Sequence, residues 1–164
     1  MDKVGGILLE FVMMLAVVFI MVCMVASYIG ESQEVNLALA AARSGATQGA
    51  NLDSMAIYPD QSFSNYSTKN QRLLFPSHVQ IIKIEYKKQD FSSVYQKTKI
   101  QIRVYARDPS LENSDDKNCM GERINYYVRK GIAETFKTEY MTNIAFNPAF
   151  SSKYYYTTAD VNWS

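Results

Sequence analysis

A single carboxylate lies at the start of a long uncharged stretch of the sequence. Glu10 is followed by residues 11–29, which contain no Asp, Glu, Lys, Arg or His. A charged side chain within hydrocarbon costs about 2.5–3.5 kcal/mol on insertion scales, so an ionisable residue in such a stretch is by default a functional one. The chemistry that Glu10 offers is therefore pairing with a cation in apolar surroundings.

Other side chains capable of chemistry are few and lie far apart in the sequence. His78 has no second histidine or cysteine near it, and Cys23 and Cys119 lie in an apolar and a polar segment respectively. Catalysis and metal binding require acids, bases, nucleophiles or ligands that converge on one point. We therefore predict that the protein is not an enzyme and has no catalytic residue, no metal site, no cofactor and no disulfide.

Two kinds of polar segment are weak functional signals. Residues 108–118 are rich in side-chain oxygens but lack the spacing of an EF-hand, so we interpret them as a solvated loop without a metal. Asn-X-Ser sequons begin at Asn65 and Asn162. They permit N-glycosylation of these two residues if that part of the chain lies outside the cell.

The overall composition limits the class of protein. The chain has 164 residues and a formal net charge of +1. Binding of nucleic-acid phosphates requires a concentrated excess of Lys and Arg, which this sequence lacks, so we expect no nucleic-acid partner. The length allows one ordinary domain besides the uncharged stretch.

The uncharged stretch is long enough to cross a membrane. At a rise of about 1.5 Å per residue, residues 11–29 cover nearly the ~30 Å hydrocarbon core. A cleaved secretory signal and a buried core helix are the alternatives, but the apolar run is longer than a signal's and leaves no polar side for solvent. The residues that follow favour helix without a proline until Pro59, so we predict one helix over about residues 7–48.

Small residues line one face of the second half of this predicted helix. They recur at three- and four-residue spacing and include Ala38, Ala42, Gly45 and Gly49. Such a face lets helix backbones approach closely, although alanine-rich helix composition ending in fraying glycines explains the pattern equally well. If the face packs against copies of the chain, Gly45→Leu should block assembly and leave the isolated subunit stable.

The remainder of the sequence predicts a small α+β domain. After a connecting loop over residues 51–77, residues 78–88 and 97–107 alternate as two strands of an antiparallel pair, with Ile82, Ile84 and Tyr86 on one face. Residues 121–141 show helical spacing of apolar side chains.

We expect this second helix to cover one face of a small antiparallel sheet. Its charged residues, Arg123 and Arg129 among them, fall largely away from the apolar positions, which is typical of a helix with one solvent-facing side. The tail over residues 150–163 is rich in Tyr, Thr and Val and should supply a last strand.

The N-terminal arrangement resembles that of the type IV pilin superfamily. A short charged leader ends in Gly5, and Glu10 and Phe11 begin the long apolar helix. The layout is most similar to archaeal pilins with a class III signal peptide, and it also resembles bacterial tight-adherence pilins and pseudopilins. The common archaeal motif after the cut is Gln-any-Ser-any-Glu-Phe, of which this chain keeps the last two positions but has Gly6 and Leu8 in place of Gln and Ser.

The resemblance implies a processing step and a role for the carboxylate. A membrane-embedded prepilin peptidase would cut between Gly5 and Gly6 on the cytoplasmic side of the membrane. The new ammonium on Gly6 would then pair with Glu10 of a neighbouring copy, so that two costly charges compensate each other and fix the axial register of the helices. A head-to-tail contact that does not close generates a helical filament.

The expected organisation and function follow from this resemblance. Residues 1–5 would be the leader, residues 6–50 the transmembrane and filament-core helix, and residues 51–164 an extracytoplasmic globular domain. The chain would be a structural subunit, held in the cytoplasmic membrane as a precursor and assembled by membrane machinery into an extracellular homopolymer for adhesion or surface attachment. The alternative is a minor pseudopilin or a membrane-anchored cell-surface binding protein.

Overall fold

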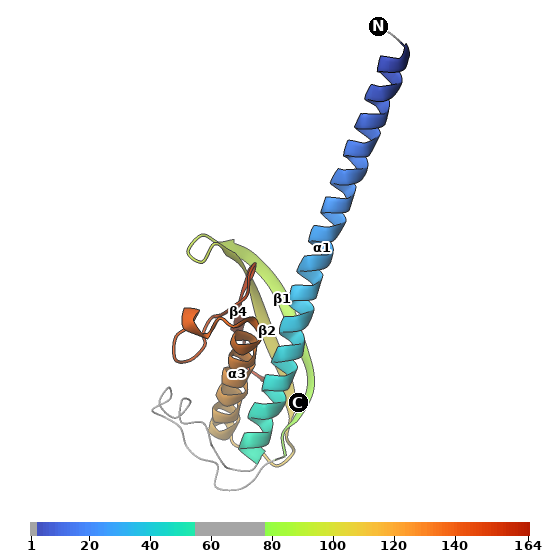
Figure 1. Ribbon diagram of the computed structural model, residues 1–164. Helices are drawn as coiled ribbons and strands as arrows, with labels where there is room; N and C mark the ends of the chain where they lie inside the picture. Colours follow the sequence, from blue (N-terminus) through green and yellow to red (C-terminus); the bar gives the residue numbers. More distant parts are fainter. Residues whose placement is uncertain (1–2, 55–77) are drawn as a thin grey trace. The chain divides into compact units, whose positions relative to one another are not determined.

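The computed structural model describes residues 3–54 and 78–164, and Figure 1 shows its order of elements. The described elements are α1 (Lys3–Ser54), β1 (Gln80–Ser92), β2 (Lys97–Arg107), α3 (Ser114–Phe136), the 3-10 helix η1 (Glu139–Met141), β3 (Ala149–Phe150), β4 (Tyr154–Thr158) and β5 (Asn162–Trp163). Helices and strands together make a mixed α+β fold, which confirms the predicted fold class.

The first helix is longer than predicted at both ends. α1 is continuous over 52 residues, and it extends through two compact units of the chain, Met1–Asn36 and Leu37–Ser164. The last part of α1 therefore belongs to the same unit as the strands and α3. This boundary lies earlier than the expected division after residue 50.

The sheet is mixed rather than purely antiparallel. Its strand order is β1-β2-β4-β3, and β5 also pairs with β2. β1 and β2 form the predicted antiparallel pair, but β4 and β5 run parallel to β2. The expectation of an antiparallel sheet is thus corrected. The chain leaves β2, passes through α3 and returns beside β2, and a crossover of this kind joins parallel strands.

A bulge in β1 changes which side chains face inward. Ile81 pairs with Ala106, and Lys83 pairs with Tyr105, so one extra residue of β1 stands between these pairs. Ile82 is that residue and is exposed. Its predicted place on one face with Ile84 is wrong, because a bulge inserts one residue and shifts the alternation of the strand.

The core of the second unit lies on one face of β2. Alternate residues of this strand, Ile100, Ile102, Val104 and Ala106, are almost completely buried, as the predicted alternation requires. α3 contacts β3 and β4. Tyr154 and Tyr156 of β4 add their rings to this core, so the tyrosine-rich tail fills the interior as well as completing the sheet.

The second helix begins earlier than predicted. α3 starts at Ser114, so the second half of the segment that we interpreted as a loop is helical. The Asn113 side chain caps it by accepting a hydrogen bond of 3.0 Å from the backbone N–H of Asp115. Asp115 and Asp116 lie in the first turn, where negative charge is favoured by the helix dipole.

Two arginines of α3 are buried, contrary to the predicted polar face. Arg123 and Arg129 are 1% and 5% exposed. The Arg129 guanidinium donates to the carbonyl of Ala145 at 3.2 Å and to the hydroxyl of Thr158. The C-terminal segment therefore covers a side of α3 that helical periodicity assigned to solvent, and it supplies acceptors for the buried donors of Arg129.

Candidate functional site

The first part of α1 presents apolar side chains on every side. Within the first unit, all residues from 9 to 30 are exposed, and large side chains such as Phe11, Phe19 and Met24 leave more than half of their area uncovered. Among the described residues, one helix is long and apolar enough to cross a membrane by length and composition, with a mean hydropathy of 2.7 in its most apolar window. Such a surface requires apolar surroundings, either lipid or other helices.

Glu10 lies near the start of this surface. The carboxylate and its neighbour Phe11 are both exposed on α1, and the backbone of Gly5 and Gly6 belongs to the same helix. Glu10 is therefore one turn of helix from the position at which cleavage would create an ammonium. In apolar surroundings a carboxylate must be neutralised or paired, and the charge of a new amino terminus is suited to pairing.

The small residues of α1 lie in the second unit, where they form a tight contact with α3. Ala38, Ala42, Ala46 and Ala50 are at most 2% exposed. A Cβ atom built on Gly45 would lie 2.2 Å from the carbonyl oxygen of Tyr127, a distance that real Cβ atoms do not adopt. The backbones of α1 and α3 therefore meet directly at this glycine.

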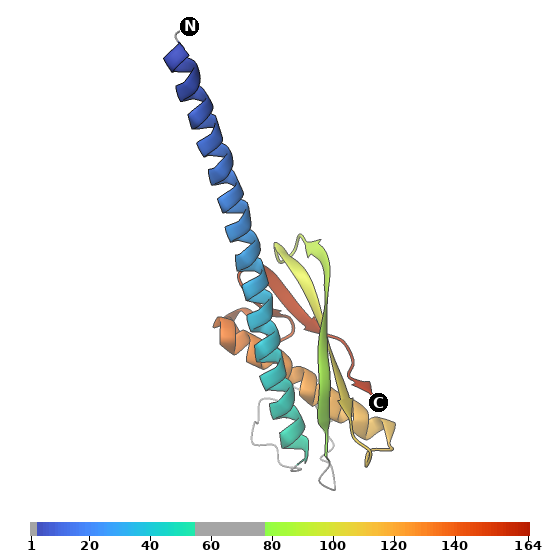
Figure 2. The ribbon, with the colours of Figure 1, turned by 90° about the vertical axis from the view of Figure 1, so that its right-hand side faces the viewer.

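Two further glycines extend the same contact, which we call the α1–α3 seam. A Cβ on Gly49 would lie 3.0 Å from Cα of Ile124, and one on Gly131 would lie 3.1 Å from the carbonyl oxygen of Ala41. Small residues on both helices thus permit one close crossing, which is visible in Figure 2 where the last part of α1 passes α3.

The seam and the burial beside it bear on the two interpretations left open for Ala38, Ala42, Gly45 and Gly49. Gly45 and Gly49 pack against α3 of the same chain, and Ala38 and Ala42 are buried within it, so these four positions are not open to the helices of neighbouring copies. The opposite side of this part of α1 carries the exposed residues Arg43, Ser44, Thr47 and Gln48. Any helix that contacts α1 here must therefore meet a polar surface.

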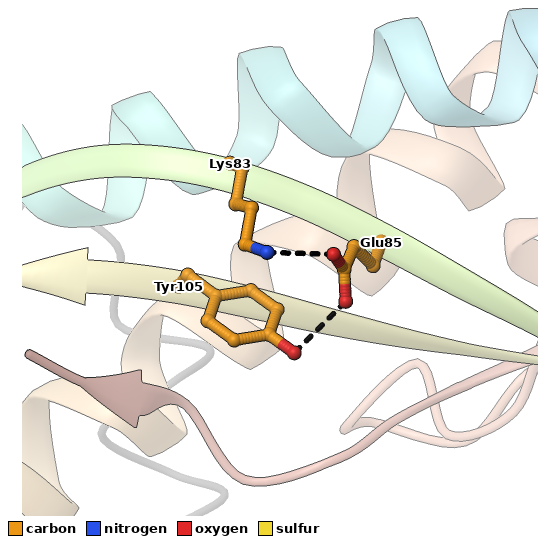
Figure 3. Close-up of polar contacts among 3 residues, drawn as sticks. All are labelled: Lys83, Glu85 and Tyr105. Atoms are coloured by element: carbon orange, nitrogen blue, oxygen red, sulfur yellow. Dashed lines mark hydrogen bonds and ion pairs between the residues drawn. The ribbon is translucent and has the colours of Figure 1, made fainter.

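A small polar cluster occupies the outer face of the β1–β2 pair (Figure 3). Lys83 Nζ donates to Glu85 Oε1 at 2.7 Å, and the hydroxyl of Tyr105 donates to Glu85 Oε2 at 2.8 Å. Hydrogen bonds from Lys83 and then Tyr105 hold the pKa of Glu85 below its ordinary value of 4.5. The same bond to Glu85 raises the pKa of Lys83.

This cluster is a surface feature rather than a reactive centre. The side chains of Lys83 and Glu85 are each about half exposed, and water screens such pairs. Among the described residues, no three His, Cys, Asp or Glu side chains are grouped to hold a metal. His78 and Cys23 are exposed, and Cys119 is half-buried.

The structure describes one of the two sequons. Asn162 is exposed in β5, at a position accessible from solvent. Asn65 lies outside the described residues. N-glycosylation of Asn65 and of Asn162 therefore stays a prediction.

Sequence reasoning missed the residues that join α3, and the chain just beyond its end, to the C-terminal segment. The Asn125 side chain donates to the carbonyl of Ala159 at 2.9 Å, and Thr138 Oγ1 donates to the carbonyl of Phe150 at 2.8 Å. Asn125 and Arg129 are four residues apart, a spacing that places them on one side of a helix. That spacing was a readable signal of a second buried side.

Comparison with known proteins identified no relative of the chain. No protein-family model matches the chain, no curated protein matches it, and no solved structure matches it. The functional argument therefore depends on the residues and geometry described above.

Proposed function

We propose that the chain is the structural subunit of an extracellular, type IV pilus-like filament that is held in the cytoplasmic membrane before assembly. The observation that carries this proposal is the exposed apolar surface of α1 over residues 9–29 with Glu10 at its start. In the membrane, lipid would cover that surface. In the filament, the same surface of other subunits would cover it.

The position of Glu10 supports assembly more than simple anchoring. A permanent anchor gains nothing from a carboxylate, because removing the charge lowers the cost of insertion. A filament gains a defined register, since the Gly6 ammonium of one subunit can meet only a Glu10 that lies at the correct height on its neighbour. Cleavage after Gly5 by a prepilin peptidase would supply that ammonium.

The seam limits the part of α1 that can form the filament core. Ala38, Ala42, Ala46 and Ala50 are buried in the second unit, Gly45 and Gly49 meet α3, and the outer side of that part of α1 is polar. Apolar contacts between subunits would therefore come from the part of α1 before Leu37. The unit Leu37–Ser164 would contribute the outer surface of the filament and any adhesive function.

The test replaces the carboxylate with a neutral side chain of similar shape. Glu10→Gln should leave insertion into the membrane intact, because an uncharged residue is less costly there, while surface filaments should become few. Immunoblots of membrane and sheared surface fractions measure both quantities. The matched control is Glu31→Gln, the same change on the same helix beyond the uncharged stretch. Filament yield equal to that of the parent chain in Glu10→Gln would reject the pairing.

The same apolar helix also suits an alternative function in which the chain is anchored in the membrane and does not assemble into a filament. A minor pseudopilin or a membrane-anchored surface protein would use α1 as an anchor and the second unit for binding. In that case the chain stays in the membrane fraction, and neither Glu10→Gln nor Glu31→Gln changes its distribution.

A further inference from the structure

The turn between β1 and β2 exposes apolar side chains at its tip. Val94 in the turn is 82% exposed, and Phe91 near the end of β1 is 60% exposed. Tyr95 holds the turn in place, since its ring lies 4.9 Å from that of Tyr155 and 5.4 Å from that of Phe150. The tip is thus a fixed apolar projection that water covers poorly.

Lysines surround an open hollow beside this tip. The hollow has a volume of about 500 Å³, and its lining includes Lys87, Lys88, Lys99 and Asp90. Three cations against one carboxylate leave a net positive charge. Phe91 and Tyr155 complete the lining, so the hollow combines cationic groups with aromatic walls.

The tip lies at a particular end of the second unit. The second unit begins at Leu37. Figures 1 and 2 show the β1–β2 turn at the end of this unit from which α1 enters, and the start of β1 at the opposite end. Leu37 follows closely after Glu31, the first charged residue beyond the uncharged stretch. If residues 11–29 span a membrane, the entry end of the second unit is the end tethered next to that membrane.

We propose that the β1–β2 tip docks on an anionic phospholipid surface in the membrane-held form of the chain. Phe91 and Val94 would enter the interface between headgroups and acyl chains, and a lipid phosphate would bind in the hollow beside Lys87, Lys88 and Lys99. Apolar and aromatic side chains flanked by lysines are favoured at this depth, because the rings leave water while the ammonium groups stay at the headgroups. This inference depends on the membrane insertion in the proposed function.

Docking would have a consequence for assembly. A subunit held at two points, α1 and the hairpin, keeps the second unit against the bilayer until it is extracted. Anionic headgroups attract lysines within about one Debye length, roughly 10 Å at 0.1 M salt, so docking should weaken as salt is raised.

The first experiment measures the depth of the tip in the full chain. Val94→Trp is reconstituted into vesicles whose lipids carry bromine on the acyl chains, and the emission of the unsubstituted chain, which contains Trp163, is subtracted. We expect the emission of the introduced tryptophan to shift to the blue and to be quenched by the bromine. The control is His78→Trp, an exposed position before the start of β1, about 40 Å along a strand of this length. The tryptophan of this control should not be quenched.

The second experiment measures the dependence on lipid charge. Quenching of Val94→Trp should be stronger in vesicles that contain phosphatidylglycerol than in phosphatidylcholine alone. Adding Lys87→Gln and Lys99→Gln should remove that difference, whereas Lys117→Gln, the same loss of charge near the start of α3, should preserve it.

The outcomes separate this inference from the function on which it depends. If the chain fails to float with the vesicles, membrane insertion fails and the proposed function fails with it. If the chain floats but Val94→Trp is not quenched, only the docking is overturned. If Val94→Trp is shielded from aqueous iodide without being quenched by brominated lipid, the tip is covered by protein, and lipid docking is again rejected.

Discussion

Gly45 of α1 and Tyr127 of α3 lie so close that a single added Cβ atom on Gly45 would come within 2.2 Å of the Tyr127 carbonyl oxygen. A carbonyl in a helix backbone cannot rotate away from such a clash, so the two helices would have to separate. The contact is therefore specific for glycine because of close backbone approach. It also shows that the small-residue face of α1 already has a partner within its own chain.

This relationship predicts that Gly45→Ala destabilises the second unit. Overpacking typically costs about 1–3 kcal/mol of the free energy of unfolding, and a backbone contact relaxes poorly. The measurement is urea unfolding of the full chain in detergent, followed by Trp163 emission. Ser44→Ala is the control, because Ser44 is exposed beside Gly45 and surface changes usually stay within about 0.5 kcal/mol. Equal midpoints for Gly45→Ala and the parent chain would show that the helices do not meet there.

The same contact reverses an expectation from sequence. A seam between copies predicts that Gly45→Leu spares the isolated subunit, whereas a seam with α3 predicts that the subunit itself loses its fold. The location of the packing partner therefore decides whether Gly45→Leu prevents assembly or unfolds the subunit.

The polar cluster on β1 and β2 predicts a pH dependence with a definite sign. The pKa of Glu85 is lowered by hydrogen bonds from Lys83 and Tyr105. The ionised carboxylate therefore contributes to the free energy of unfolding above pH 4.5, and this contribution is lost as pH falls through the lowered pKa. Lys83→Gln should raise the pKa of Glu85 toward its ordinary value, and Tyr105→Phe should raise it less. The carboxyl carbon shift in NMR titrations reports it directly. An unchanged titration of Glu85 in Lys83→Gln would contradict the observed pairing.

Processing predicts a new amino terminus in surface material. If a prepilin peptidase acts on this chain, the surface form should begin at Gly6, and Gly5→Leu should retain the leader and remain in the membrane. Intact-mass analysis of the surface and membrane fractions measures both. A surface form that begins at Met1, or after Ala26 as a secretory signal would give, would remove the basis for pairing Gly6 with Glu10.

The sequence predicted contact faces better than it predicted contact partners. Repeated small residues from Ala38 to Gly49 indicate a face for close packing, but a helix of the same chain and a helix of a copy meet that requirement equally. What selects α3 is the backbone approach at Gly131 and Tyr127, which lie far along the chain. No local pattern carries that information.

Strand pairing shows the same division between local and distant signals. Alternation identified β1 and β2 correctly, because hairpin strands are neighbours in sequence. It gave no direction for β4, whose parallel pairing with β2 depends on the path of the chain through α3. The bulge at Ile82 shifts the register of β1. The residue types around Ile82 are ordinary strand residues, so the sequence does not signal this shift.

The early start of α3 was readable in the sequence. Asn113 followed by Ser114, Asp115 and Asp116 is typical of a helix N-terminus, but the polar composition favoured the loop interpretation. The burial of Arg123 and Arg129 was harder to predict, since arginine is almost never fully buried unless it is paired. The acceptors of Arg129, Ala145 and Thr158, belong to distant segments.

The central claim is that the chain builds a surface filament through the apolar part of α1. The most direct test is electron microscopy of material sheared from the cell surface, labelled with an antibody against the second unit, from cells that have or lack this chain. The account predicts continuous labelling along filaments that disappear when the chain is absent. Antigen confined to the membrane fraction, with no labelled filaments in cells that express the chain, would contradict it.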